Sequence, residues 1–349
     1  MLSRRTVMLG LAGVGLSATA SAAPSGRVAD VDPVAPSKGW QTFGGGRLLR
    51  IPADPGAGYH APGFLYLPPG LSGPRTLVVV GPNNIISSSQ GDTDAVLLGL
   101  LEWMRAEYGD ATGTPLLMPA FLRPPEPGIL HELFRRHDNL DTHSLRRDAL
   151  LTERKGFRRI DLQTLALIDA ARAALRPEGV EAERRVIYAG WSAAGSFGDR
   201  MSALHPDRTK ALVVGGFGAT PLLPVAELGG ERLLYPLGTA DMEAITGRPF
   251  QAARHAEIPY LLMHGTDDPN DPLPGVDRFG RQQRRVAQEV LGRRPMDRVD
   301  TVRDVFARAG HDAFELRLYP GVDHGGSRDI AIDMGEFIRE HALGAPVER

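Results

Sequence analysis

Short apolar runs alternate along the chain with longer segments whose apolar residues recur at helical spacing. The runs are rich in aliphatic and β-branched side chains, which is typical of strands buried on both faces of a sheet. We expect strands at 63–67, 76–80, 115–118, 185–189, 211–214, 259–263 and 314–319, and helices at 94–108, 159–175, 193–204 and 327–341. This alternation predicts an α/β fold with a mostly parallel, doubly wound sheet.

In such a sheet the parallel strands all end at the same edge, and ligands bind there. The residues that directly follow each strand are therefore the first candidates for a functional site. Three of these positions carry side chains that suggest chemistry: Ser192, Asp268 and His324.

Ser192 follows the expected strand 185–189 in the stretch Gly190-Trp191-Ser192-Ala193-Ala194. The stretch nearly matches G-x-S-x-G, a tight strand–turn–helix that exposes a nucleophilic serine, with Ala194 in place of the last glycine. Small residues are needed because this turn brings the strand and helix backbones together. The alternative is a serine that only caps the helix.

Asp268 follows the expected strand 259–263, within His264-Gly265-Thr266-Asp267-Asp268. We take Asp268 as the candidate acid, with Asp267 as the second choice. One alternative is a turn in which these carboxylates cap backbone N–H groups. Another is a metal loop, but its spacing fits no EF-hand; its ligands would be Asp267, Asp268, Asn270, Asp271 and Asp277.

His324 follows the expected strand 314–319 in a glycine-rich loop, and we take it as the candidate general base. A serine hydroxyl is a poor nucleophile until an imidazole accepts its proton and an acid orients that imidazole. Ser192, Asp268 and His324 occur in the order nucleophile, acid, base. This is the order of α/β-hydrolases and differs from two other familiar triad orders.

Such chemistry also needs donors for the developing oxyanion. We expect the backbone N–H groups of Ala193 and, in the loop after strand 76–80, of Asn83, because Pro82 has no N–H. The alternative for Asn83 is a simple turn. Further side chains are candidates for substrate contact: Trp191, Asn84, His143 and Arg146. The alternative for Asn84 is the same turn, and for His143 and Arg146 it is an exposed charged helix face.

The first 23 residues have the layout of an export signal. Arg4 and Arg5 precede an apolar stretch and then small residues, which resembles a twin-arginine signal cleaved after Ala20 or Ala23. The apolar stretch is too short for a stable membrane span, although an N-terminal anchor is the alternative. We expect a periplasmic or secreted protein with no membrane span after signal removal.

Residues 24–45 are rich in Pro, Ser and small side chains, which indicates a linker or lead-in. One α/β domain is expected over 46–345, with possible cap segments at 121–158 and 217–256. Gly44-Gly45-Gly46 follows no strand of a βαβ unit, so it indicates a turn rather than a phosphate-binding loop.

Composition narrows the function further. The formal net charge is -2 and no basic stretch is dense, so we expect no nucleic-acid partner. The chain has no cysteine, which excludes disulfides and thiolate chemistry.

From about residue 60 to residue 342 the chain resembles the α/β-hydrolase superfamily and, within it, the secreted polyhydroxybutyrate-depolymerase and feruloyl-esterase-like group. The resemblance rests on FLYLPPG, GWSAAGSFGDRMSALHPDRTKALVVGG, IPYLLMHGTDD and LRLYPGVDHGG. It implies that Ser192, Asp268 and His324 are nucleophile, acid and base. Two features depart from the group: Gly81-Pro82 replaces its usual His-Gly, and its frequent disulfides are absent.

The sequence therefore predicts an exported serine hydrolase that cleaves carboxylic esters through an acyl-enzyme, with no cofactor and no metal. The substrate is a small-molecule or polymeric ester. A serine peptidase, an amidase or a lipase on the same fold is the first alternative, because the same three side chains serve all of them. A non-catalytic binding protein is the second.

Overall fold

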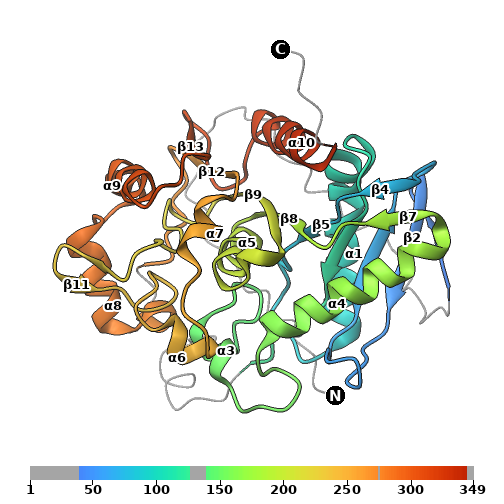
Figure 1. The fold of residues 1–349 in the computed structure, drawn as a ribbon, viewed down its shortest axis with the longest axis horizontal. Helices are drawn as coiled ribbons and strands as arrows, with labels where there is room; N and C mark the ends of the chain where they lie inside the picture. The colour runs from blue at the N-terminus through green and yellow to red at the C-terminus, as the bar shows by residue number, and fades with distance from the viewer. Residues whose placement is uncertain (1–38, 126–138, 274–275, 344–349) are drawn as a thin grey trace, which may run out of the picture.

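A computed structural model describes residues 39–125, 139–273 and 276–343 (Figure 1). A nine-stranded sheet in the order β1-β2-β3-β6-β5-β8-β9-β12-β13 forms its centre. In chain order, its strands are β1 (Gln41–Phe43), β2 (Gly46–Ile51), β3 (Gly63–Leu67), β5 (Val78–Val80), β6 (Leu116–Pro119), β8 (Val186–Trp191), β9 (Thr209–Gly215), β12 (Tyr260–Gly265) and β13 (Phe314–Tyr319).

The strands from β6 to β13 are parallel to one another, and β1, β2 and β3 are paired antiparallel at the other end of the sheet. The carboxyl ends of β5, β8, β9, β12 and β13 therefore lie along one edge. This confirms the mostly parallel α/β architecture expected from the sequence.

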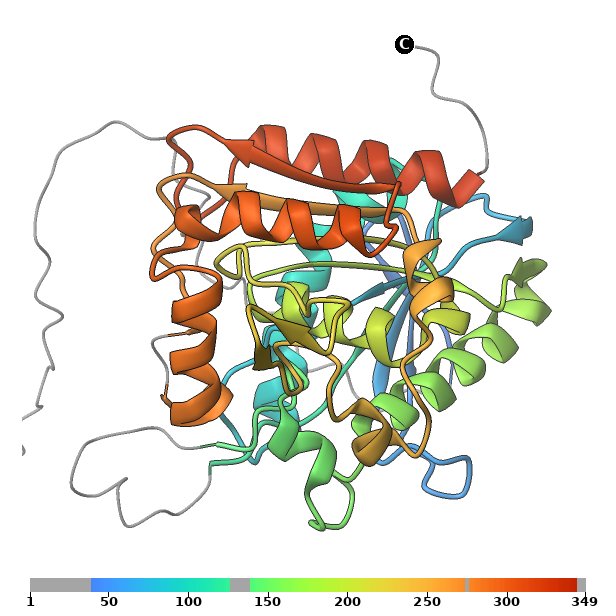
Figure 2. The ribbon, with the colours of Figure 1, turned by 60° about the vertical axis from the view of Figure 1, so that its left-hand side comes forward.

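Helices cover both faces of the sheet (Figures 1 and 2). They are α1 (Gln90–Met104), α3 (Arg147–Leu151), α4 (Ile160–Leu175), α5 (Ala193–Leu204), α6 (Met242–Thr246), α7 (Ala252–Ala256), α8 (Val276–Val290), α9 (Pro295–Arg308) and α10 (Arg328–Leu343). The apolar side chains of α1 and α10 form one core on one face, and those of α4, α5 and α9 belong to a second core on the other.

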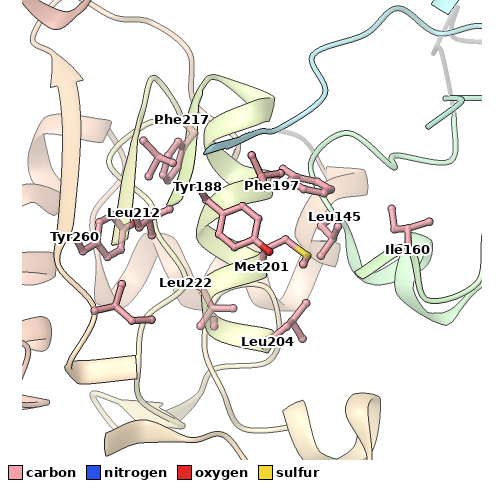
Figure 3. Close-up of a cluster of buried hydrophobic side chains, with 14 of the residues drawn as sticks. Leu145, Ile160, Tyr188, Phe197, Met201, Leu204, Leu212, Phe217, Leu222 and Tyr260 are labelled. Atoms are coloured by element: carbon pink, nitrogen blue, oxygen red, sulfur yellow. The ribbon is translucent and has the colours of Figure 1, made fainter. Parts of the chain in front are cut away.

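Alternation along β8 shows how one strand serves both cores. Tyr188 packs in the core on the α5 face, whereas its neighbours Ile187 and Ala189 pack in the core beside α1 and α10. Figure 3 shows Tyr188 beside Phe197 and Met201 of α5. Burying each such large side chain stabilises the fold by about 1.5–3 kcal/mol relative to exposure.

Two smaller strand pairs lie outside the main sheet. β4 (Gly73–Arg75) pairs in parallel with β7 (Val180–Ala182), and β10 (Glu227–Leu228) forms an antiparallel hairpin with β11 (Glu231–Arg232). The second pair lies in the excursion 217–256, together with α6 and α7. Of the excursion 121–158, the structure describes all but 126–138, and α3 lies near its end.

The structure corrects two expectations. The sheet begins at Gln41 rather than at residue 46, because β1 and β2 form a hairpin through the turn at Gly44 and Gly45. The helices α8 and α9 were not expected. The proposed signal 1–23 and most of the lead-in 24–45 lie outside the described residues.

None of the helices in the described residues has the length and apolar character needed to cross a bilayer.

Candidate active site

Ser192 occupies a strained turn between the end of β8 and the start of α5. Its backbone has φ 61 and ψ -126, a conformation that costs a non-glycine residue about 1–3 kcal/mol. Its N–H donates to the carbonyl of Gly215 on β9 (2.8 Å), and its own carbonyl accepts the N–H of Ser196 (3.0 Å). The Ser192 side chain makes no capping hydrogen bond, so the capping alternative is wrong.

Glycine is required where the turn meets its neighbours. A Cβ atom at Gly190 would lie 2.5 Å from the carbonyl carbon of Ala194, and one at Gly81 would lie 2.5 Å from the carbonyl oxygen of Ala194. A Cβ at Gly195 would lie 2.7 Å from the oxygen of Gly215. The backbone of Ala194, rather than its side chain, makes the close contacts, which explains why alanine fits at the last motif position.

The hydroxyl of Ser192 faces the imidazole of His324, with 3.1 Å between Oγ and Nε2. On the other side of the ring, Nδ1 lies 3.1 Å from both carboxylate oxygens of Asp268. If Nδ1 carries the ring proton and donates a hydrogen bond to Asp268, Nε2 is free to accept the hydroxyl proton of Ser192. The structure thus brings together the three side chains that the sequence singled out.

The two neighbouring carboxylates after β12 have different environments. The side chain of Asp268 is 0 % exposed, and its Oδ1 also accepts the N–H of Asn270 (2.8 Å). Asp267 is exposed, and its Oδ1 accepts a hydrogen bond from the hydroxyl of Thr266 (3.2 Å). The geometry therefore favours Asp268 as the partner of His324.

His264, at the end of β12, is fully buried and lies near enough to Asp268 to feel its charge. Burial lowers the pKa of His264, and the nearby Asp268 opposes that shift only in part. A neutral imidazole leaves the charge of Asp268 available to His324.

Trp191, which precedes Ser192, contacts the loop that carries His324. Its indole Nε1 donates to the backbone oxygen of His324 (2.9 Å), and the two ring centroids are 6.4 Å apart. The indole lies against bare backbone, because a Cβ at Gly216 would come within 2.4 Å of it. Trp191 was expected to contact substrate. Its indole N–H is occupied by the loop of His324, and a substrate contact by Trp191 stays a prediction.

The loop after β5 lies beside the turn at Ser192, as the close approach of Gly81 and Ala194 shows. Ala193 is the first residue of α5, where backbone N–H groups have no acceptor within the helix. Asn83 is partly exposed, whereas Asn84 is buried and its Nδ2 donates to the carbonyl of Phe121 (2.6 Å). Ala193 and Asn83 as oxyanion donors, and Asn84 as a substrate contact, stay predictions.

His143 and Arg146 are both engaged within the protein. His143 is buried with Nδ1 2.5 Å from Oδ1 of Asp141. Burial raises the pKa of Asp141, but the charge and hydrogen bond of His143 outweigh it and hold that pKa well below its usual range. Arg146 binds Asp148 through two hydrogen bonds of 2.9 and 2.5 Å. A substrate contact by either residue stays a prediction.

The described residues contain no group of three or more side chains suited to hold a metal ion. Of the carboxylates in the metal-loop alternative, Asp268 faces His324 and Asp271 forms an ion pair with Arg298 (2.7 Å). The side chain of Asp277 lies outside the described part. The burial of Arg298 was not predicted from the sequence, although this arginine falls among the apolar positions of α9.

A scan of known protein-family models finds no match to this sequence, and neither does a search of curated proteins. Solved structures do match in fold. The poly(3-hydroxybutyrate) depolymerase LpqC from Bordetella parapertussis has a TM-score of 0.50 and 17% identity, over 86% of this chain and 88% of its own.

An S-formylglutathione hydrolase from Agrobacterium tumefaciens has a TM-score of 0.47 and 14% identity, over 87% of this chain and 97% of its own. Carboxyl esterase 2 from the fungus Tuber melanosporum has a TM-score of 0.45 and 15% identity, over 87% and 90%. At 17% identity, the likeness to LpqC speaks to the fold alone. Together with the strand order and the serine turn, it shows that this chain has the α/β-hydrolase fold.

Proposed function

We propose that the protein is a serine hydrolase that cleaves carboxylic esters through an acyl-enzyme intermediate. The observation that carries this proposal is the continuous contact from Ser192 Oγ through the imidazole of His324 to Asp268, with each distance 3.1 Å. These contacts join residues from three separate strand ends.

In the first half of the reaction, Ser192 Oγ attacks the ester carbonyl carbon while Nε2 of His324 accepts the hydroxyl proton. The carbonyl π-electrons move to the oxygen and form an oxyanion. When the carbonyl re-forms, the C–O bond to the alcohol breaks, and the imidazolium gives its proton to the departing alkoxide. Asp268 holds the ring and stabilises the imidazolium without taking its proton.

In the second half, Nε2 accepts a proton from water, and the hydroxide attacks the acyl carbon. The C–O bond to Ser192 then breaks, and the imidazolium returns the proton to Oγ. The carboxylic acid leaves, and the enzyme returns to its starting state. No redox change occurs, so these steps need no redox cofactor.

The oxyanion needs preorganised donors, and each donor is worth about 2.7–4 kcal/mol of transition-state stabilisation. We propose the backbone N–H groups of Ala193 and Asn83. The position of Ala193 at the start of α5 supports the first, because a helix N-terminus favours negative charge. The contact between Gly81 and Ala194 supports the second, because it brings the loop of Asn83 beside this turn.

A p-nitrophenyl ester series from acetate to laurate, run beside aminoacyl and prolyl p-nitroanilides, tests the proposal. We expect turnover of esters by the protein without residues 1–23, no comparable turnover of the anilides, and loss of activity in Ser192→Ala. Preferential cleavage of the anilides would instead identify a peptidase. A preference for the longest acyl chains would point to a lipase.

We also propose that the protein is exported to the periplasm or the medium. The support is the sequence of residues 1–23, with Arg4 and Arg5 before a short apolar stretch. Fusing 1–30 to a folded reporter tests this. Replacement of both arginines by lysine should keep the reporter in the cytoplasm, and undiminished export of that variant contradicts a twin-arginine route.

A further inference from the structure

Arg298 of α9 is a fully buried arginine close to the candidate active site, with 0 % of its side chain exposed. Its Nη1 and Nη2 each lie 2.7 Å from one carboxylate oxygen of Asp271. Nη1 also donates to the carbonyl of Gly218 (3.2 Å) and to Oγ1 of Thr220 (2.9 Å). The Arg298 guanidinium therefore binds the loop after β12 and the loop after β9 at the same time. We call residues 266–273 the acid loop and residues 216–220 the β9 loop.

Two further bonds complete the surroundings of this guanidinium. Nε donates to the carbonyl of Gly292 (3.1 Å), and Nη2 donates to that of Arg293 (3.0 Å). A buried charge is tolerated only with a partner charge and with its donors satisfied, and Arg298 meets both conditions. A well-packed apolar pair is often as stable as a buried ion pair. The ion pair between Arg298 and Asp271 is therefore better explained by the loop geometry that it fixes than by a gain in stability.

The acid loop is short, and hydrogen bonds hold it at Asn270 and at Asp271. Asn270 orients the candidate acid directly, because its N–H donates to Oδ1 of Asp268 (2.8 Å). The side-chain amide of Asn270 donates to the carbonyl of Gly216 in the β9 loop (2.7 Å). At the far end, Oδ1 of Asp271 accepts the N–H of Leu273 (2.9 Å) as well as the bond from Arg298.

The two loops also pack against each other without a gap. A Cβ atom at Gly218 would lie 2.8 Å from Pro272 Cδ and 3.0 Å from the carbonyl oxygen of Asn270. The β9 loop in turn adjoins the nucleophile, because Gly215, just before it, accepts the N–H of Ser192 (2.8 Å). Arg298 thus joins the segment that carries the acid to the segment that supports the nucleophile.

We propose that Arg298 is a positioning residue that holds Asp268 against His324 by locking the acid loop to the β9 loop. This inference rests on the proposed serine-hydrolase function. Arg298 touches none of the three reacting side chains and acts only through the acid loop. Lysine keeps the charge but cannot form the forked contact with Asp271, so the carboxylate of Asp268 would shift relative to the imidazole.

The test compares Arg298→Lys with the matched control Arg303→Lys. Arg303 lies on the same helix, donates to the carbonyl of Leu316 (2.8 Å) and forms an ion pair with Asp300 (3.6 Å), and neither contact reaches the acid loop. For each variant, fluorophosphonate titration gives the active fraction, and kcat, KM and the pH profile of kcat/KM are then measured per active site.

We expect Arg298→Lys to lower kcat by between about tenfold and 100-fold with KM changed little, because misplacing a catalytic group by about 1 Å costs that much. The acidic limb of the kcat/KM profile should move to lower pH, because a displaced Asp268 stabilises the imidazolium less. Titratable groups near His324 include Asp268, His264 and, on its own loop, Asp323. None of these is changed in either variant.

A second variant, Asn270→Ala, loosens the same loop but leaves the buried ion pair intact. Asn270→Ala should move the acidic limb of the kcat/KM profile in the same direction as Arg298→Lys. It provides the test if Arg298→Lys proves too unstable to purify. If the folded variants keep the kcat per active site and the acidic limb of the unmodified protein, the positioning role is overturned, even where the melting temperature falls. Failure of the unmodified protein to turn over esters or react with fluorophosphonate would overturn the proposed function instead.

Discussion

The indole N–H of Trp191 donates to the backbone carbonyl of His324 at 2.9 Å, so the residue before Ser192 holds the loop of His324. The contact links the end of β8 to the loop after β13 across two intervening strands. It sets the position of the imidazole from the backbone side, while Asp268 sets it from the ring side.

Trp191→Phe removes this bond and keeps an aromatic ring over Gly216. One neutral hydrogen bond contributes about 0.5–1.5 kcal/mol, so we expect kcat to fall by roughly threefold to tenfold with little change in KM. Steady-state kinetics on a p-nitrophenyl ester measures this. Trp103→Phe is the control, because Trp103 is 53 % exposed on α1. Equal losses in both variants would rule out a specific role for the Trp191 bond.

Asp268→Asn tests which of the two adjacent carboxylates orients the base. An amide cannot stabilise the imidazolium and can present an N–H to Nδ1, which enforces the wrong tautomer. We expect kcat to fall by about 10³–10⁴-fold. Asp267→Asn, one residue away and exposed, should stay within about twofold of the unmodified protein. The reverse ranking of the two variants would transfer the role to Asp267.

Gly190→Ala inserts a methyl group where the backbone of Ala194 lies 2.5 Å away. The turn must open, so we expect loss of most esterase activity and a lower free energy of unfolding by about 1–3 kcal/mol. Ala194→Gly is the matched variant that restores the full motif. It should keep its activity and lose about 1 kcal/mol, as glycine does within a helix. Urea unfolding and ester turnover report both quantities.

Acid should destabilise the fold through a buried histidine pair. His255 Nδ1 lies 2.8 Å from Nε2 of His311, and burial, followed by the charge of His311, lowers the pKa of His255 from 6.5 to about 3. Between these values the unfolded state binds the proton and the folded state does not. Stability is therefore complete above the unfolded value and falls as the pH drops through this window, by up to about 1.4 kcal/mol per pH unit for this group.

Urea unfolding at several pH values between 7 and 4 measures that slope. His255→Asn should reduce the slope of the free energy of unfolding against pH by the equivalent of up to one bound proton. Part of the slope should remain, because burial also lowers the pKa of His264, His311 and His341. His60→Asn, at an exposed position, should leave the slope unchanged. An unaltered slope in His255→Asn would show that this pair does not carry the acid sensitivity.

Much of this architecture was predictable, because buried parallel strands have a strong local signature. Runs such as 76–80 and 259–263 consist of side chains that suit burial on both faces, and the structure places β5 and β12 within or next to them. The meeting of Ser192, His324 and a carboxylate after β12 followed from one rule, that parallel strands end at one edge.

Other features depend on contacts that no local pattern specifies. The choice between Asp267 and Asp268 rests on a turn in which the N–H of Asp268 bonds to Gly265, and this turn directs the second carboxylate inward. Arg298 lies 27 residues from Asp271, and only the packing of α9 reveals their pairing. The hairpin of β1 and β2 was missed because its strands are partly exposed and Gly44 to Gly46 suggested only a turn.

The central claim is that Ser192 is the nucleophile activated by His324. The most direct measurement is the intact mass of the protein, of Ser192→Ala and of His324→Ala after incubation with a fluorophosphonate. We expect a single phosphonyl group on the unmodified protein, located on the peptide that contains Ser192. No label on Ser192→Ala and very slow labelling of His324→Ala should accompany it. An unmodified protein that takes up no label, or equal labelling of Ser192→Ala, would contradict the account.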